Sequence, residues 1–302
     1  MKKSRADRVF DAVNVALMIA VLFLMLYPIY FTVIASFSEP SYVATGKVTF
    51  WVCGFTLDAY RNVFENDKVW TGYGNTLFYT VAGTLLNLAL TIPAAYVLSK
   101  KHLRGRTLFS WYFAFTMYFS GGLIPSFLVV RDLGLLNSRM TLVVLNGLSV
   151  YNMIVTRVYY QTSIPGELYE AAEIDGCGEF GQFFRVALPL SAPIVAVMAL
   201  FYAVARWNDY FTGLVYISDS KMYPLQLVLR NILIENRTAI NQLQATGAHI
   251  NDQEMLYLSR QAYLAEAMKY ALIFIASLPL LVAYPFVQKH FVKGVMIGAV
   301  KG

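Results

Sequence analysis

Charged residues are scarce in this sequence. They make up 14% of its 302 residues, whereas soluble domains contain about 25%. Hydrophobic residues account for 58%, and the mean hydropathy is +0.53. Such a chain has too little polar surface to cover a water-soluble globule, which argues against a soluble enzyme, a disordered tail and a fibrous protein. The expected solvent is a lipid bilayer.

Cysteine and histidine are also rare. The two cysteines cannot form a disulfide scaffold or, on their own, a zinc site. His102, His249 and His290 are scattered along the chain and make no ligand set, so we expect no metal. No nucleophile elbow or serine–histidine arrangement stands out. The sequence therefore predicts no catalytic residues.

Basic residues outnumber acidic ones by 24 to 18, which gives a net charge of +6. In a soluble protein this balance would suggest a nucleic-acid partner. Here many of the basic residues stand in short segments next to apolar runs, where they orient membrane helices. We therefore expect membrane lipid around the chain and no nucleic acid.

Long apolar windows predict an all-α membrane protein with six transmembrane helices, because a span needs about 20 mainly apolar residues. The fourth window is the weakest, since it carries Arg157 near one end. Residues 1–302 are expected to form a single transmembrane domain, with a loop at about 165–185 and a long outer segment at about 206–266. The expected spans are 12–38, 74–99, 107–130, 140–161, 186–205 and 268–288.

Lysine and arginine cluster in three short segments that lie on one side of the membrane if there are six spans. These segments are the N-terminus, residues 100–106 and the C-terminus. Because basic residues are retained on the cytoplasmic side, both termini are predicted to be cytoplasmic. Cys53 then lies outside and Cys177 inside, which argues against a disulfide between them.

The most informative stretch runs from Pro165 to Pro193, between the fourth and fifth spans. It predicts a short helix from Glu167 to Asp175, a break at Gly176–Gly178, and a second helix leading into the membrane. Pro165 suits the start of a helix, and glutamates suit its positive end. Gly176 suits a residue with positive φ at a helix C-terminus.

This stretch resembles the EAA loop of ABC-importer permeases. The likeness rests on a fixed spacing, with Val186 where the family usually has isoleucine. The matching residues are Glu170, Ala171, Ala172, Gly176, Leu188 and Pro189.

The resemblance covers nearly the whole chain and is closest to the carbohydrate, or MalG-like, permeases. Within these it resembles the subgroup found with lipoprotein binding proteins for complex oligosaccharides. Short matches occur in the family's order along the chain. They are Asn75-Thr76-Leu77, Ala95-Tyr96, Gly105-Arg106, Trp207-Asn208-Asp209-Tyr210 and Gly298-Ala299-Val300-Lys301-Gly302.

The resemblance implies a permease subunit of an ATP-driven importer, in the plasma membrane of a bacterium, that moves oligosaccharides by alternating access. It implies a second, homologous permease, two ATPase subunits and an extracellular or lipoprotein solute-binding protein as partners. The EAA helix would dock on an ATPase, with Glu170 supplying charge-assisted contacts, Gly176 the turn, and Leu188-Pro189 the link to span five. Lys301 and Gly302 would reach between the ATPases, a frayed tail being the alternative.

The chain lacks a phosphate-binding loop of its own. Its one Gly-Lys pair, Gly46-Lys47, has Ser41 in place of the first glycine and Val48 in place of the hydroxyl residue. No cofactor is therefore expected on this chain. ATP and Mg²⁺ are expected on the separate ATPase, which supplies the hydrolysis.

Candidate sugar-path residues lie near the predicted outer ends of spans, with helix capping and loop anchoring as the alternative role. They are Asn75, Trp207, Asn208 and Asp209. An importer for peptides or another polar solute would keep the EAA loop and change the cavity. A secondary transporter would place ionisable residues inside its spans, and these spans are nearly free of them. A membrane enzyme would need a reactive constellation, which the sequence does not show.

Overall fold

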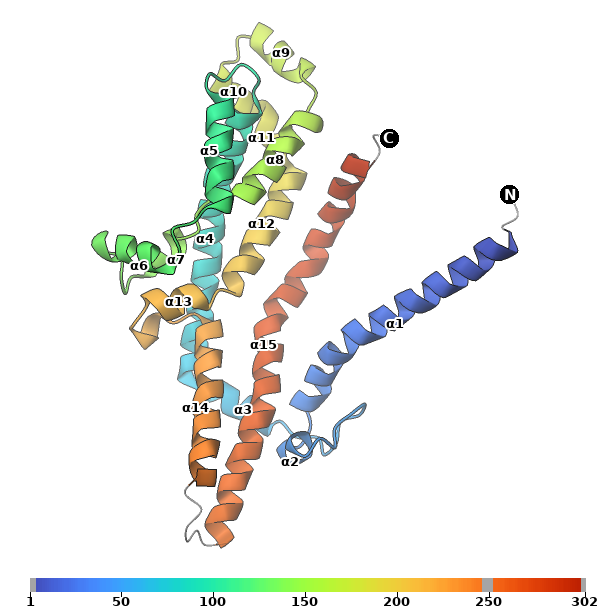
Figure 1. Cartoon of the computed structure of the whole chain (residues 1–302), viewed down its shortest axis with the longest axis vertical. Helices are drawn as coiled ribbons and strands as arrows, with labels where there is room; N and C mark the ends of the chain where they lie inside the picture. Colours follow the sequence, from blue (N-terminus) through green and yellow to red (C-terminus); the bar gives the residue numbers. More distant parts are fainter. Residues whose placement is uncertain (1–3, 246–251, 300–302) are drawn as a thin grey trace. The chain divides into compact units, whose positions relative to one another are not determined.

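The computed structural model describes residues 4–245 and 252–299, and this part of the chain is helical without a β-strand (Figure 1). A π-helical turn at Phe183–Ala187 and a 3₁₀ turn at Ser220–Met222 complete the regular structure. The α-helices are α1 (Arg5–Ser36), α2 (Pro40–Ala44), α3 (Asp58–Phe64), α4 (Asp67–Ser99), α5 (Arg106–Tyr118), α6 (Leu123–Asp132), α7 (Arg139–Val144), α8 (Val150–Thr162), α9 (Glu167–Ile174), α10 (Glu179–Gln182), α11 (Leu188–Leu190), α12 (Ala192–Trp207), α13 (Phe211–Tyr216), α14 (Leu225–Ala245) and α15 (Asp252–Ala299).

The chain divides into two compact units. The first comprises residues 1–69 and 229–278, and the second comprises residues 70–228 and 279–302. In the first unit, Ile34, Ala35, Val43 and Val48 form a small buried cluster. The second unit contains the residues on which the expected function depends, and its contacts are described below.

Three helices are long and apolar enough to cross a membrane: Ala6–Ser36, Asp67–Ser99 and Ser259–Val282. Two bent pairs raise the number of candidate spans to five. Arg106–Tyr118 and Leu123–Asp132 meet at 112°, and Glu179–Leu190 and Ala192–Trp207 meet at 77°. The prediction of an all-α chain with several membrane helices is thus confirmed for the described residues.

The predicted spans at 107–130 and 140–161 are each broken in the structure. The first breaks between α5 and α6, where Gly122 has a φ of 83°. The second is divided into α7 and α8 by a turn in which Asn146 has a φ of 57°. Left-handed backbone conformations interrupt an α-helix, and apolar composition alone does not reveal them.

The last predicted span, 268–288, lies inside a much longer helix. α15 begins at Asp252, so the predicted outer segment at 206–266 is largely helical and includes α13, α14 and the start of α15. The apolar window missed this start because the helix begins in a more polar stretch ahead of the apolar residues.

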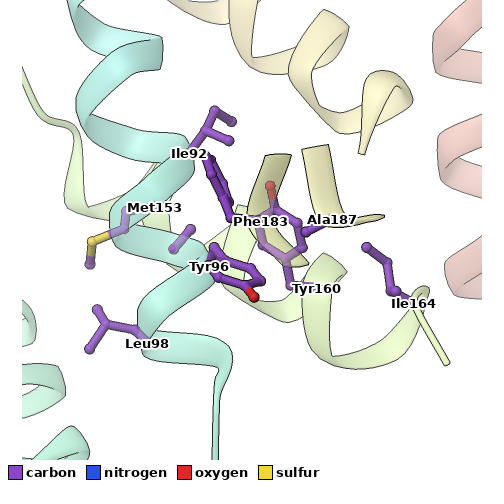
Figure 2. Close-up of a cluster of buried hydrophobic side chains, with 9 residues drawn as sticks. Ile92, Tyr96, Leu98, Met153, Tyr160, Ile164, Phe183 and Ala187 are labelled. Carbon is purple, nitrogen blue, oxygen red and sulfur yellow. The ribbon is translucent and has the colours of Figure 1, made fainter. Parts of the chain in front are cut away.

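An aromatic cluster forms the core of the second unit where α4 ends (Figure 2). Tyr96 contributes the central ring, with ring centroids 5.7 Å from Tyr160 and 5.0 Å from Phe183. These three side chains are almost completely buried. The cluster therefore connects α4 and α8 with the π-helical turn that follows α10.

Candidate functional site

The stretch predicted as an EAA loop forms a helix, a glycine turn and a second helix. α9 spans Glu167–Ile174, with Asp175 as its C-cap, which confirms the predicted short helix. The amide of Gly176 donates to the Glu173 carbonyl at 3.0 Å, and the amide of Cys177 donates to the Ala172 carbonyl at 2.9 Å. This pair of bonds is the Schellman ending of a helix. Gly176 has a φ of 76°.

The need for glycine at position 176 is conformational rather than steric. A Cβ atom added to Gly176 would meet no heavy atom within 4 Å. Only the positive φ disfavours other side chains there. The direction in which the chain leaves α9 is therefore set by the backbone of one residue.

One face of α9 is uncovered. Glu170 and Ala171 are exposed, and Ile174 is 87% exposed despite being a large apolar side chain. Residues three and four apart lie on the same side of a helix, so these three residues form one continuous surface, which we call the outward face of α9. Because nothing in the described part of the chain covers this face, another protein could contact it.

The opposite face of α9 is attached to the end of α4 through Tyr169. Its ring lies 6.2 Å from the ring of Tyr96, and the Lys100 ammonium lies 3.6 Å from the Tyr169 ring centroid. Lys100 also donates to the Gln182 side chain at 2.9 Å. A cation over an aromatic face is attractive, so Lys100 holds α9 and α10 against α4.

The electrostatics of this attachment follow from partial burial. Burial raises the pKa of Tyr169 to about 12, which keeps its hydroxyl neutral. Burial also lowers the pKa of Lys100, an effect that the nearby carboxylates of Glu179 and Glu173 oppose. A further link joins the same segments, because His102 Nε2 lies 3.0 Å from a carboxylate oxygen of Glu179.

The attachment continues from α10 to α12 through an irregular segment. The chain passes through the π-helical turn and α11, which contains Leu188 and Pro189, before bending by 77° into α12. Leu188 is half-buried and Pro189 is exposed. At the bend, the Tyr160 hydroxyl donates to the buried Ser191 hydroxyl at 3.2 Å.

Asn75 anchors a loop. It is 4% exposed, and its Nδ2 donates to the backbone carbonyls of Lys221 at 2.8 Å and Tyr223 at 3.0 Å. The neighbouring Thr76 hydroxyl accepts from the Leu225 amide at 2.7 Å. These bonds tie the start of α4 to the 3₁₀ turn before α14.

The other three candidate sugar-path residues differ in exposure. Trp207 is 3% exposed and packs edge-on against Tyr73, with ring centroids 5.6 Å apart. Asp209 accepts from the Thr212 amide at 3.0 Å, near the start of α13. Asn208 is exposed and donates to the Val204 carbonyl one turn earlier.

We predict that Asn75→Ala lowers the free energy of unfolding by about 1–3 kcal/mol, because two carbonyls lose their donor. Asn208→Ala is the matched control. It is expected to change stability by less than about 0.5 kcal/mol, since the side chain is on the surface. Thermal unfolding of both purified variants in detergent measures the difference. Equal unfolding temperatures would contradict the anchoring role of Asn75.

The sequence prediction missed Arg206, which is only 7% exposed at the end of α12. Its Nε donates to Asn87 Oδ1 at 3.1 Å, and its terminal nitrogens donate to three backbone carbonyls. These bonds join α12 to α4, to the end of α7 and to the turn between α7 and α8. The acceptors are Leu142 at 2.7 Å, Val143 at 3.1 Å and Asn146 at 3.2 Å.

Arg206 was predicted only as the first residue of the outer segment. The sequence signal that could have revealed its role is an arginine directly after an apolar helix. A charged side chain at such a position needs hydrogen-bonding partners within the protein. Gly83 on α4 makes room for it. A Cβ atom added to Gly83 would lie 2.8 Å from Arg206 Nε.

No cluster of three or more potential metal ligands of the His, Cys, Asp or Glu type occurs in the described part of the chain. Both cysteines are free. The predicted tail residues Lys301 and Gly302 lie outside the described residues.

Comparison with known proteins identifies the family. Residues 69–297 match the family described as "Binding-protein-dependent transport system inner membrane component". The chain is 40% identical over its full length to Protein LplC of Bacillus subtilis (strain 168), covering 98% of that protein. It is 37% identical to the polygalacturonan/rhamnogalacturonan transport system permease protein YtcP of the same organism, covering 98% of this chain and 99% of that one.

A solved structure agrees with these relatives. A chain in the crystal structure of a bacterial ABC transporter involved in the import of the acidic polysaccharide alginate is similar in fold, with a TM-score of 0.84 and 34% identity. The match covers 96% of this chain and 99% of that chain. This chain therefore belongs to the family of binding-protein-dependent transport system inner membrane components, as a multi-pass permease subunit of a bacterial ABC transport system that is not itself catalytic.

Proposed function

We propose that this chain is one permease half of an importer that carries oligosaccharides across the bacterial cytoplasmic membrane by alternating access. The observation that carries the proposal is the outward face of α9, an uncovered helix surface held by Tyr169 and Lys100 to the aromatic core. The relatives support the substrate class. One is a polygalacturonan/rhamnogalacturonan permease, another is an arabinooligosaccharides permease, and the similar structure belongs to an alginate importer.

In this proposal the outward face of α9 docks in a groove on an ATPase subunit, which binds ATP and Mg²⁺. Glu170 makes charge-assisted hydrogen bonds, while Ala171 and Ala172 allow close approach. Gly176 fixes the turn, and Leu188 and Pro189 lead into the fifth span. A docked α9 that moves with the ATPase displaces Tyr169, and with it the ring cluster around Tyr96.

The proposed complex contains a second, homologous permease, two ATPases and an extracellular or lipoprotein solute-binding protein. The subgroup with binding proteins for complex oligosaccharides fits the likeness to LplC and YtcP. Six spans, with both termini in the cytoplasm, require each broken segment, α5–α6 and α7–α8, to serve as one crossing. Lys301 and Gly302 are proposed to reach the ATPases.

The sugar path is proposed to pass the outer ends of α4 and α12. Asn208 contributes an exposed amide there, whereas Asn75, Trp207 and Asp209 shape the path through the loop contacts described above. Exposed amides bind sugar hydroxyls by hydrogen bonds. Among the four candidates, Asn208 is therefore the residue proposed to contact the sugar directly.

The proposal is tested by purifying the complex from its native membrane in gentle detergent and identifying the co-purifying proteins. An ATPase, a second permease and a binding protein are expected. The reconstituted complex is then tested for ATPase stimulation by acidic and neutral oligosaccharides and by peptides. Stimulation by peptides alone would replace the sugar with the alternative substrate, and recovery of this chain alone would contradict the importer.

A further inference from the structure

A groove with two limbs opens beside the last turns of α4. Its first limb, of about 400 Å³, is lined by Tyr96, Phe180 and Phe183 among others. Tyr96 and Phe183 also belong to the buried cluster of Figure 2, where their side chains lie next to each other. Its second limb, of about 340 Å³, is lined by Ala94, Phe109 and Phe113 among others. Both volumes are in the range of small-molecule sites.

The two limbs are neighbours. Pro93, Val97 and Leu103 line both of them, so the limbs meet along the final turns of α4 and at Leu103 in the loop that follows. The first limb extends toward α10 and the second toward α5. The groove is open to its surroundings, since Val97 is 45% exposed and Phe109 is 49% exposed.

A basic loop lies at the mouth of this groove. Residues 100–106 include Lys100, Lys101, Arg104 and Arg106 and no acidic residue. Lys100, His102 and Glu179 line the first limb, but Lys100 is already bonded to Gln182 and His102 to Glu179. Lys101 and Arg104 are exposed, and neither side chain has an ion pair or hydrogen bond within residues 4–245 and 252–299.

We propose that the groove binds one anionic phospholipid of the cytoplasmic leaflet. One acyl chain occupies each limb, and Lys101 and Arg104 bind the phosphate. Two adjoining apolar limbs match a ligand with two hydrocarbon tails. The exposed positive charges on the loop that borders the groove match its headgroup, because basic residues just beyond a membrane helix attract anionic lipid. The cytoplasmic placement rests on the proposed function.

The lipid has a defined structural effect. Its tails contact α4, α5 and Phe180, which belongs to α10 and is otherwise 84% exposed. Bound lipid therefore stabilises the position of α10 against α4. It acts in addition to the contacts that Lys100 makes with Gln182 and Tyr169. Anionic lipid is then a requirement for efficient coupling between the ATPase and the permease.

The test is lipid retention by the complete complex, measured by native mass spectrometry. The complex is reconstituted in nanodiscs of equal parts dioleoylphosphatidylglycerol and dioleoylphosphatidylethanolamine, and then released into detergent. The expected result is one tightly retained phosphatidylglycerol that is lost in two variants. The Lys101→Gln/Arg104→Gln variant is expected to bind it about 30-fold more weakly, as each cation near the surface contributes on the order of fivefold. Val97→Trp fills the junction of the limbs.

Two matched variants control for general effects. Arg8→Gln removes a basic residue from another exposed segment, and Leu85→Trp adds the same bulk to α4 at a side chain that is 62% exposed and outside the groove. Both are expected to retain the lipid. Equal retention of the two lipids by the parent complex, or unchanged retention in both groove variants, would overturn the proposal. So would a cross-link showing that a partner subunit fills the groove.

Lipid retention and transport are separate measurements. Retained phosphatidylglycerol in a complex that oligosaccharides fail to stimulate in any lipid would contradict the proposed function and leave the lipid site standing. Sugar-stimulated ATPase that is equal in phosphatidylglycerol and phosphatidylethanolamine, with no retained lipid, would reject the lipid site alone.

Discussion

Glu170→Gln is expected to reduce oligosaccharide uptake by about tenfold or more while the subunit remains in the membrane. A hydrogen bond to a charged group contributes about 1.5–3 kcal/mol, and Glu170 lies on the outward face of α9, where it is free to contact an ATPase. ATP hydrolysis in the variant complex is expected to continue without control by the sugar-loaded binding protein. Uptake and ATPase rates are measured in the same proteoliposomes.

The control is Glu173→Gln on the same helix. Glu173 follows Tyr169 by four residues and Glu170 by three, so it lies at the border between the side of α9 that faces α4 and the outward face. Its replacement removes the same charge one turn further along the helix and is expected to leave uptake within about twofold, since exposed charges away from a contact contribute little. Equal losses in both variants, or unchanged uptake in Glu170→Gln, would reject the docking role.

A companion pair tests the turn. Gly176→Val is expected to abolish uptake, because a β-branched residue is strongly disfavoured at a φ of 76°. Gly176→Asn is expected to retain much of it, because asparagine tolerates this conformation and the site has room for the side chain. Equal activity of the two variants would show that the direction of the turn does not matter.

Arg206→Met is expected to lower the free energy of unfolding by about 3–5 kcal/mol, since each buried polar group left without its partner costs about 1–3 kcal/mol. The substitution leaves the Asn87 side chain and the carbonyls of Leu142, Val143 and Asn146 without this donor. Thermal unfolding of the purified subunit in detergent measures the loss. A change below about 1 kcal/mol would mean that these groups find other partners.

Gly83→Ala tests the same contact from the other side. The added methyl group would lie 2.8 Å from Arg206 Nε, so the guanidinium must move, and overpacking of this kind costs about 1–3 kcal/mol. Gly74→Ala on the same helix meets no atom within 4 Å. It is expected to be neutral or to stabilise by up to about 1 kcal/mol, because alanine favours helix more than glycine does.

The sequence predicted the parts of this molecule that depend on local pattern. Apolar windows predicted an all-α chain with several membrane helices, and the spacing from Glu167 to Gly176 predicted α9 and its ending almost to the residue. These features depend on neighbouring residues alone. Polar contacts between residues far apart in the sequence could not be predicted from local patterns. Arg206 and Asn87 are 119 positions apart, and no local pattern shows that they meet.

The breaks within predicted spans were missed for the same reason. Asn146 adopts a left-handed conformation in a segment whose composition is apolar, and its carbonyl accepts from both the Asn87 and the Arg206 side chains. The partners that stabilise this turn come from two other helices. The docking residues on α9, the sugar path and the order of the six spans remain predictions.

The bend between α11 and α12 determines what kind of motion reaches the membrane. Because Glu179–Leu190 meets Ala192–Trp207 at 77°, the segment that links α9 to α12 extends sideways from α12 as an arm. A force on the end of such an arm, directed across it, exerts a torque about the long axis of α12. A straight helix would transmit only a push or a tilt. A small displacement at α9 would therefore rotate α12 about its long axis. The side chains along α12 would then turn together toward or away from the proposed sugar path.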